Sequence, residues 1–254
     1  MRTIKLILAY DGAEFHGWQI QPDKPTVQGE VMRALEEVTG VRTHVDASGR
    51  TDAGVHALAQ VASFHTDARI PCDKLSKALN RLLPPSIRIL AVEEVDERFH
   101  ARFQATAKTY RYRIYHGKVC PPHLWRLVHH YPYPLDVEAM RRAAALFLGA
   151  HDFTSFAATQ ELPEGSRVRT LFSSELTEED QELVYTVRGS GYLHHMVRNI
   201  AGTLLEIGKG NLQPADVPRI LEARNRSAAG PTAPAKGLWL VSVEYGRMQD
   251  DAVR

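Results

Sequence analysis

The sequence has little cysteine and no long apolar run. Its 254 residues include two cysteines, Cys72 and Cys120, which lie far apart and outside any CxxC spacing. Neither a disulfide framework nor a cysteine zinc site is indicated, so we expect a reduced, cytoplasmic compartment. No run approaches the roughly 18 consecutive apolar residues of a membrane-spanning helix. We therefore expect no membrane-spanning segment.

Acidic residues are absent from one stretch, although the net charge of the whole chain is only +1. Between Arg98 and His130 there are seven Lys or Arg and five His, and no Asp or Glu. A solvated surface normally mixes both signs of charge. Tyrosines 110, 112 and 115 are interleaved with these cations, a pattern that suits a polyanion with stackable bases. The alternative is a basic surface strand without a ligand.

The periodicity of apolar residues predicts the same order of elements twice: strand, helix, strand, strand, helix, strand. In the first half the elements are Thr3–Tyr10, Val27–Thr39, Thr43–Ala47, Ala59–His65, a helix capped by Asp73 that ends before Pro84, and Ile87–Val95. In the second half they are Thr109–Tyr115, a helix from Asp136 to Gly149, Arg169–Leu176, Leu183–Arg188, Tyr192–Ile207, an extra helix at Pro214–Arg224, and Leu238–Tyr245.

This order is that of the split βαβ, or ferredoxin-like, unit. We therefore predict an α+β protein with two ferredoxin-like halves, residues 1–104 and 105–254. The two halves are expected to form a continuous antiparallel sheet with helices on one face. The other face is then free to line a basic cleft, which is the natural place for a polyanion.

One loop, ASGRTDAGVHA at residues 47–57, carries more charged groups than a chain reversal needs. Its two glycines permit close approach of a ligand. Arg50 and His56 supply positive or switchable charge near Asp52, which favours the ionised carboxylate that a nucleophile or base requires. The alternative is an Asx turn, in which Asp52 bonds its own backbone. Asp11, in YDG, is interpreted as a plain turn aspartate.

The predicted helix at Tyr192–Ile207 carries the motif HHMVRN. His194 and Arg198 are four residues apart and share one side of a helix. Arg198 would either extend its guanidinium into solvent or reach across the cleft to a carboxylate or phosphate. The adjacent histidines, His194 and His195, would point about a hundred degrees apart on a helix. Without an HExxH motif or a cysteine partner, we expect no metal site.

Alternation along the strand at Thr109–Tyr115 divides its residues between two faces. Tyr110 and Tyr112 share one face, and Arg111 and Arg113 share the other. One face is expected to be core and the other a basic surface. A tyrosine at the mouth of the cleft would stack on a base, whereas the alternative is core packing with a satisfied hydroxyl.

Several motifs together closely resemble the tRNA pseudouridine synthase A family over nearly the whole chain. They are YDGAEFHGWQIQ (10–21), TVQGEVMRAL (26–35), SGRTDAGVHA (48–57), FHARFQATAKTYRYRIY (99–115), DFTSF (152–156), YLHHMVRNIAGTLLEIG (192–208) and APAKGLWLVSVEY (233–245). The resemblance implies an isomerase that converts uridine to pseudouridine at positions 38, 39 and 40 of the tRNA anticodon stem-loop. It also implies a homodimer without cofactor or metal. The loop at Gln160–Arg167 does not align with the family.

The resemblance also implies roles for individual residues. Asp52 would be the nucleophile, Tyr110 would stack on the target base, and Arg198 would pair with Asp52. Arg50 would hold the place of the flipped-out nucleotide. The residues expected to bind substrate are Arg50, Tyr110, His56, Arg111, Arg113 and Lys108.

The sequence leaves the chemical route open. The carboxylate would attack uracil C6 or ribose C1′, or promote elimination to a glycal. Tyr110, Asp52 or a water would remove the C5 proton. Two rival functions are a catalytically silent RNA-binding protein and a metal-dependent hydrolase that uses some of the twelve histidines. The silent protein leaves the carboxylate of the 47–57 loop without a purpose, because a surface that binds phosphates has little use for a negative charge.

Overall fold

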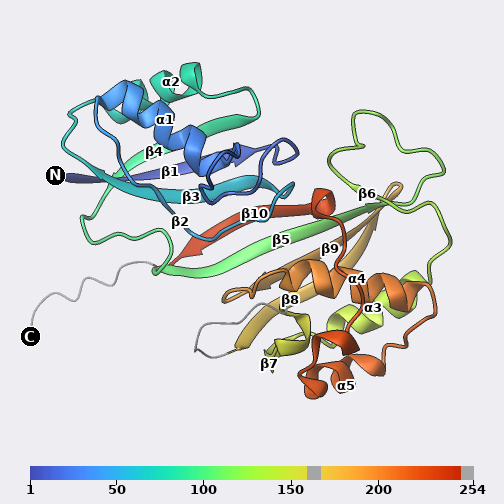
Figure 1. The fold of residues 1–254 in the computed structure, drawn as a ribbon. Helices are drawn as coiled ribbons and strands as arrows, with labels where there is room; N and C mark the ends of the chain where they lie inside the picture. The colour runs from blue at the N-terminus through green and yellow to red at the C-terminus, as the bar shows by residue number, and fades with distance from the viewer. Residues whose placement is uncertain (159–166, 247–254) are drawn as a thin grey trace, which may run out of the picture.

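The structure, a computed structural model, describes residues 1–158 and 167–246 (Figure 1). Its strands are β1 Arg2–Tyr10, β2 Asp46–Ala47, β3 His56–Thr66, β4 Ile87–Val95, β5 Ala105–Tyr115, β6 His129–His130, β7 Gly149–Asp152, β8 Val168–Glu179, β9 Glu182–Gly189 and β10 Leu238–Tyr245. Its α-helices are α1 Val27–Thr39, α2 Cys72–Leu82, α3 Val137–Ala145, α4 Met196–Gly208 and α5 Asp216–Ala223. The predicted α+β class is confirmed. None of the described helices is long and apolar enough to span a bilayer.

The described strands form one mostly antiparallel sheet in the order β4-β1-β3-β10-β5-β9-β8-β7. β2 pairs with β3, and β6 pairs with β5. The strands up to Val95 therefore lie in the order β4-β1-β3-β2, and the later strands repeat it as β10-β5-β9-β8. The two groups join through β3 and β10, which run parallel and pair only at Trp239 with His56 and at Leu240 with Ala57.

Two helices begin where their sequences predict, and the first of them also ends as predicted. Thr26 caps α1 by accepting a hydrogen bond from the Gly29 amide, and Gly40 ends the helix with a φ of 74°. Asp136 caps α3 by accepting a hydrogen bond from the Ala139 amide at 2.9 Å. These short polar side chains satisfy amides that the first helical turn leaves without partners.

Several predicted boundaries are wrong. Asp73 does not cap α2, which begins at Cys72 after Pro71, so the aspartate lies inside the first turn. The helix α3 ends at Ala145 rather than at Gly149, which begins β7 with a φ of 103°. The strand predicted from residue 43 is only the two residues of β2.

The long helix also begins later than predicted, at Met196 instead of Tyr192. The residue before it, His195, has a φ of 62°, which an ordinary side chain seldom adopts and which cannot continue a right-handed helix. Residues 192–195 therefore form an irregular approach to α4. Both histidines of the HHMVRN motif lie on this approach.

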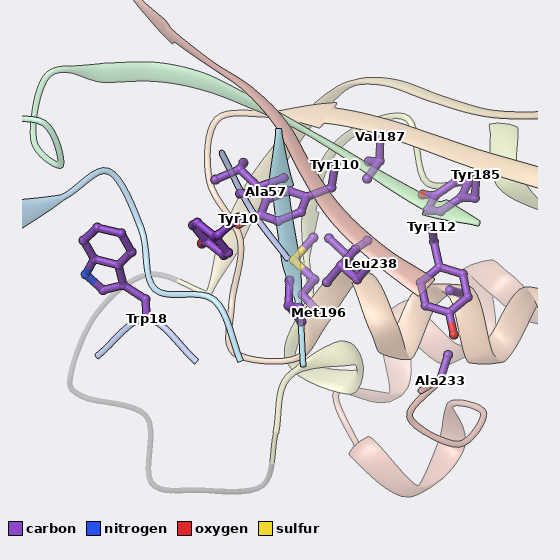
Figure 2. Close-up of a cluster of buried hydrophobic side chains, with 14 of the residues drawn as sticks. Tyr10, Trp18, Ala57, Tyr110, Tyr112, Tyr185, Val187, Met196, Ala233 and Leu238 are labelled. Atoms are coloured by element: carbon purple, nitrogen blue, oxygen red, sulfur yellow. The ribbon is translucent and has the colours of Figure 1, made fainter. Parts of the chain in front are cut away.

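The hydrophobic core is continuous across the join between the two groups of strands. Figure 1 shows α1 and α2 beside β4-β1-β3, and α3, α4 and α5 beside β5-β9-β8. Figure 2 shows the centre of the core, where Tyr10 and Ala57 meet Tyr110, Leu238 and Met196. Because one cluster spans both groups of strands, packing fixes the position of each group relative to the other.

A segment before β10, residues 230–233, lies directly against α4. The Ala233 amide donates to the Arg198 carbonyl at 3.1 Å, and the Arg198 Nε donates to the Ala233 carbonyl at 2.8 Å. Gly202 permits this approach, because a Cβ there would lie 1.7 Å from the Pro231 carbonyl oxygen. The same contact therefore packs the segment and orients Arg198.

We expect Gly202→Ala to destabilise the protein. Alanine favours a helix by about 1 kcal/mol over glycine, but forcing a methyl group into a filled site costs about 1–3 kcal/mol. The approach of 1.7 Å puts this site at the upper end, so we expect a net loss of about 2 kcal/mol. Urea unfolding followed by circular dichroism measures the change, and a midpoint equal to that of the parent would contradict it.

Candidate active site

A cleft of about 860 Å³ separates the loop that follows β2 from the approach to α4. It is lined by residues 44–53 on one side, by Lys108 and Tyr110 of β5, and by residues 192–197 on the other side. Tyr110 belongs to the buried face of β5, together with Tyr112 and Ile114. The cleft therefore opens on the helix-bearing face of the sheet, and not on the opposite face as predicted from the sequence.

The loop that carries Asp52 is held by its neighbours on both sides. The Trp18 amide donates to the Thr51 carbonyl at 3.0 Å, and the Gly54 amide donates to the Phe15 carbonyl at 3.2 Å. The Tyr10 hydroxyl lies 2.8 Å from the Thr51 hydroxyl, and burial raises the pKa of Tyr10 to about 12. The phenol is therefore neutral at physiological pH, and the loop is fixed by hydrogen bonds rather than free to move.

The Asp52 carboxylate faces Arg198 across the cleft. Its Oδ2 accepts a hydrogen bond from Arg198 Nη1 at 2.9 Å, and the two side chains are only 20% and 15% exposed. A carboxylate this shielded from water has lost part of its hydration free energy. Attraction to a nearby cation offsets that loss. The guanidinium supplies that charge and is itself oriented by the Ala233 carbonyl. The structure thus brings together the two residues predicted to pair.

The adjacent histidines also face Asp52. His195 Nε2 lies 3.3 Å from Oδ2, and His194 Nε2 lies 3.5 Å from Oδ1. The prediction that they point a hundred degrees apart is wrong, because both precede α4 instead of belonging to it. Burial lowers the pKa of His195, although the Asp52 carboxylate opposes this shift. Three side chains of opposite or switchable charge therefore surround one carboxylate.

Tyr110 forms part of the floor of this cleft. Its ring lies edge-on to Tyr192, with the ring centroids 5.0 Å apart, and only 8% of the residue is exposed. The Tyr192 hydroxyl donates to the Lys108 and Val187 carbonyls, each at 3.1 Å. Burial, with smaller contributions from Tyr10 and Asp52, raises the pKa of Tyr110. Its hydroxyl is therefore protonated near neutral pH.

Cationic side chains line the same cleft. Lys108 Nζ donates to the Ser48 carbonyl, and burial together with the nearby Arg102 charge lowers the pKa of Lys108 to about 8. Arg50 and Arg102 are exposed at the cleft. Arg102 belongs to the basic stretch between Arg98 and His130 but was not among the residues predicted to bind substrate, because alternation along a strand does not extend into the turn before it. These cations suit a phosphate backbone.

A model of the family described as tRNA pseudouridine synthase matches residues 6–104 and 143–246. The chain belongs to the tRNA pseudouridine synthase family. A tRNA pseudouridine synthase A from Solibacter usitatus is 55% identical over 96% of this chain and all of its own length. The relatives of the same name from Brevibacillus brevis and Acetivibrio thermocellus are 48% and 46% identical, each over 96% of this chain and all of their own length. The predicted family and its enzyme class, isomerase, are confirmed.

A solved structure, the crystal structure of a Cbf5-Nop10-Gar1 complex, has a chain that matches 79% of this one. The match covers 54% of that chain at a TM-score of 0.33 and 12% identity.

His56 does not reach the cleft of this synthase, contrary to its predicted role in binding substrate. Its Nδ1 accepts a hydrogen bond from the Gly12 amide at 3.1 Å, and its Nε2 lies 3.0 Å from the Arg126 carbonyl. The ring is fully buried and stacks on Trp239, with the centroids 4.4 Å apart. His56 therefore holds the join between the strand groups instead of contacting a ligand.

Arg111 and Arg113 do not reach this cleft either. Both lie on the opposite face of β5, where they line a second hollow of about 760 Å³. Arg113 makes two hydrogen bonds of 2.8 Å to the Glu182 carboxylate. The sequence indicated that one face of β5 is core and the other basic, and the cleft proved to lie on the core side. The unaligned loop at Gln160–Arg167 lies outside the described residues, except for Arg167.

We expect the stability of the synthase to fall in mild acid, partly because of His56. Burial lowers the pKa of His56 below its ordinary 6.5, and this effect exceeds the opposing effect of Asp11. Below that ordinary pKa the unfolded chain binds a proton that the folded protein resists, so the free energy of unfolding decreases as pH falls. His129, whose pKa burial lowers to about 4, contributes in the same direction.

Urea unfolding at about pH 7.5 and about pH 5.5 measures this loss of stability. We expect His56→Gln to be less stable than the parent at both values, because it loses the ring that stacks on Trp239. The difference between its two values should nevertheless be smaller than that of the parent. His151→Gln, a substitution of a more exposed histidine, serves as the control. An equal pH dependence in the parent and the His56 variant would contradict the prediction.

Proposed function

We propose that this enzyme isomerises uridine to pseudouridine at positions 38, 39 and 40 of the tRNA anticodon stem-loop, with Asp52 as the nucleophile. The observation that carries the proposal is the Asp52 carboxylate, held by Arg198 at 2.9 Å in a cleft whose floor is Tyr110. A nucleophile, a compensating cation and an aromatic surface thus meet in one space that can admit a base.

The reaction replaces the bond from ribose C1′ to uracil N1 by a bond from C1′ to C5. Asp52 initiates it by attack on C6 or C1′, or by promoting elimination to a glycal, and the base then turns before it is rejoined. The C5 proton leaves to water, and a proton is taken up at N1, so the product is an isomer of the substrate. The reaction needs no oxidant, and the base that leaves C1′ through N1 is the group that is rejoined through C5.

Arg198 supports this chemistry by aligning a shielded carboxylate and compensating its charge. Its Nη1 binds Asp52, while its Nε is anchored to the Ala233 carbonyl. A guanidinium makes both bonds at once from a planar fork, which a lysine ammonium cannot do in the same geometry. The guanidinium therefore compensates the charge of Asp52 and fixes the orientation of its carboxylate.

Tyr110 is the proposed stacking platform for the flipped base. Extruding a paired uridine costs a few kcal/mol, and stacking on an aromatic ring offsets about 1–3 kcal/mol of that cost. Because burial raises the pKa of Tyr110, its phenolate is scarce near neutral pH. This favours Asp52 or a water over Tyr110 for removal of the C5 proton.

Arg50, Arg102 and Lys108 are the proposed contacts to the RNA backbone, and Arg50 fills the space of the flipped nucleotide. All three line the cleft that contains Asp52. Phosphate contacts position RNA without identifying bases, which suits an enzyme that acts on neighbouring uridines. This set does not include Arg111 and Arg113, which lie on the opposite face of β5. It does not include His56 either, which is fully buried.

We also propose that residues 1–104 and 105–254 are two ferredoxin-like halves. The support is the strand order, β4-β1-β3-β2 and then β10-β5-β9-β8, which is the same in both. The homodimer implied by the family resemblance and the cytoplasmic location expected from the two separated cysteines stay predictions.

Release of tritium from transcript labelled at uracil C5 tests the role of Asp52. We expect Asp52→Asn to lower the rate of release at least about a thousandfold, because the amide cannot act as a nucleophile. Binding of the transcript, measured by filter retention, should change little. The control is Asp73→Asn, which changes an exposed aspartate on α2 in the same way.

Tritium release by the parent and none by Asp52→Asn would support the proposed isomerase with Asp52 as its nucleophile. If neither protein released tritium but both bound transcript, the proposal would be wrong and the rival RNA-binding function would stand. A loss of activity in Asp73→Asn would show that the assay reports general damage.

We expect Arg198→Lys to lower kcat for tritium release by about a hundredfold, with a smaller change in KM. The ammonium can compensate Asp52 or bond the Ala233 carbonyl, but it cannot do both in the geometry of the guanidinium. Single-turnover kinetics at saturating enzyme separate this loss from weaker binding. A change confined to KM would mean that Arg198 binds RNA rather than aligning the nucleophile.

A further inference from the structure

Asp52, His194 and His195 form a cluster with the spacing of a metal site. Within the described ranges 1–158 and 167–246, they are the one group of three His, Cys, Asp or Glu whose ligand atoms all lie within 4.8 Å of one another. The closest pairs are Asp52 Oδ2 with His195 Nε2 at 3.3 Å and Asp52 Oδ1 with His194 Nε2 at 3.5 Å. Both imidazoles therefore direct the same nitrogen towards one carboxylate.

These distances suit a small divalent ion with tetrahedral coordination. Zinc binds histidine nitrogen and carboxylate oxygen at about 2.0–2.2 Å, so two of its ligand atoms lie about 3.3 Å apart. The separation of 3.3 Å between His195 Nε2 and Asp52 Oδ2 matches an edge of that tetrahedron, and His194 Nε2 lies 3.5 Å from the other carboxylate oxygen. Two imidazoles and a carboxylate also leave a fourth position for water. Mg²⁺ prefers oxygen ligands alone, so this donor set discriminates against it.

We propose that Asp52, His194 and His195 bind Zn²⁺, and that the bound ion inhibits the enzyme by occupying its nucleophile. The binding part of this proposal stands on the geometry of the three side chains. The inhibitory part rests on the proposed role of Asp52. The ion acts as a regulator of the site and takes no part in the isomerisation.

Arg198 limits how tightly the ion binds. Its guanidinium already bonds Asp52 Oδ2 at 2.9 Å, and a divalent cation on the same carboxylate meets the repulsion of that charge. The metal must therefore share Asp52 with Arg198 or displace it. Removing the charge of Arg198 should strengthen metal binding and abolish the isomerisation. One substitution would therefore change the two activities in opposite directions.

Zinc binding is measured by titrating ZnCl2 into the full chain in competition with a chromophoric chelator. We expect His194→Gln, His195→Gln and Asp52→Asn each to raise the Kd of the tightest site at least about tenfold. His116→Gln is the matched control, because its imidazole also lies beside a carboxylate, 3.6 Å from Glu178. Its Kd should equal that of the parent. Zinc bound equally well by the parent and the three site variants would overturn the proposal.

Arg198→Gln provides a test that misfolding cannot imitate. We expect this variant to bind Zn²⁺ more tightly than the parent by at least about threefold, because the opposing charge is gone. A damaged site would bind more weakly. An unchanged or raised Kd in this variant would contradict the proposed position of the ion.

Inhibition is tested separately by tritium release with added ZnCl2, followed by excess chelator. We expect release to stop at the zinc concentrations that fill the site and to return after chelation. If the parent releases no tritium at all, the proposed function fails, while the binding titration still decides on the metal site. If zinc binds at the three residues but release continues, the inhibitory part of the proposal is wrong.

Discussion

The ion pair of Asp52 and Arg198 is the constraint on which the arrangement of the site depends. Its two members are 146 positions apart in the sequence and 2.9 Å apart in space. Neither residue can be placed without the other, because a largely buried carboxylate needs a cation and a largely buried guanidinium needs an anion. The pair therefore requires the two groups of strands to hold a fixed relative position.

The sheet and the core supply that fixed position. The parallel contact between β3 and β10 is short, only two residue pairs, so hydrogen bonds at the join are few. The continuous core around Tyr10, Tyr110 and Leu238 compensates by packing side chains from both groups together. His56 and Trp239 stack on the other face of the same join. The loop of Asp52 ends immediately before His56, so the join and the candidate active site are parts of one assembly.

The sequence predicted the elements well where a local pattern decides them. The Asp136 cap and the alternation of Tyr110 with Arg111 depend on neighbours in the chain, and both are found in the structure. His195 could not be predicted, since a positive φ at a non-glycine residue is enforced by tertiary contacts. The burial of His56 was missed for a related reason. A histidine beside the loop of Asp52 has the same sequence context whether its side chain points into the cleft or is buried beneath it.

The ion pair of Asp52 and Arg198 is costly to keep in the interior. Replacing a buried ion pair by apolar residues of similar volume is often neutral or stabilising, so Asp52 and Arg198 are not needed for the fold alone. Simple ion pairing would also be satisfied by a lysine, without a second anchor at the Ala233 carbonyl. The first turn of α4 adds further positive potential, because the amides at a helix N-terminus carry partial positive charge. Positive charge is thus concentrated around the one carboxylate that we propose as the nucleophile.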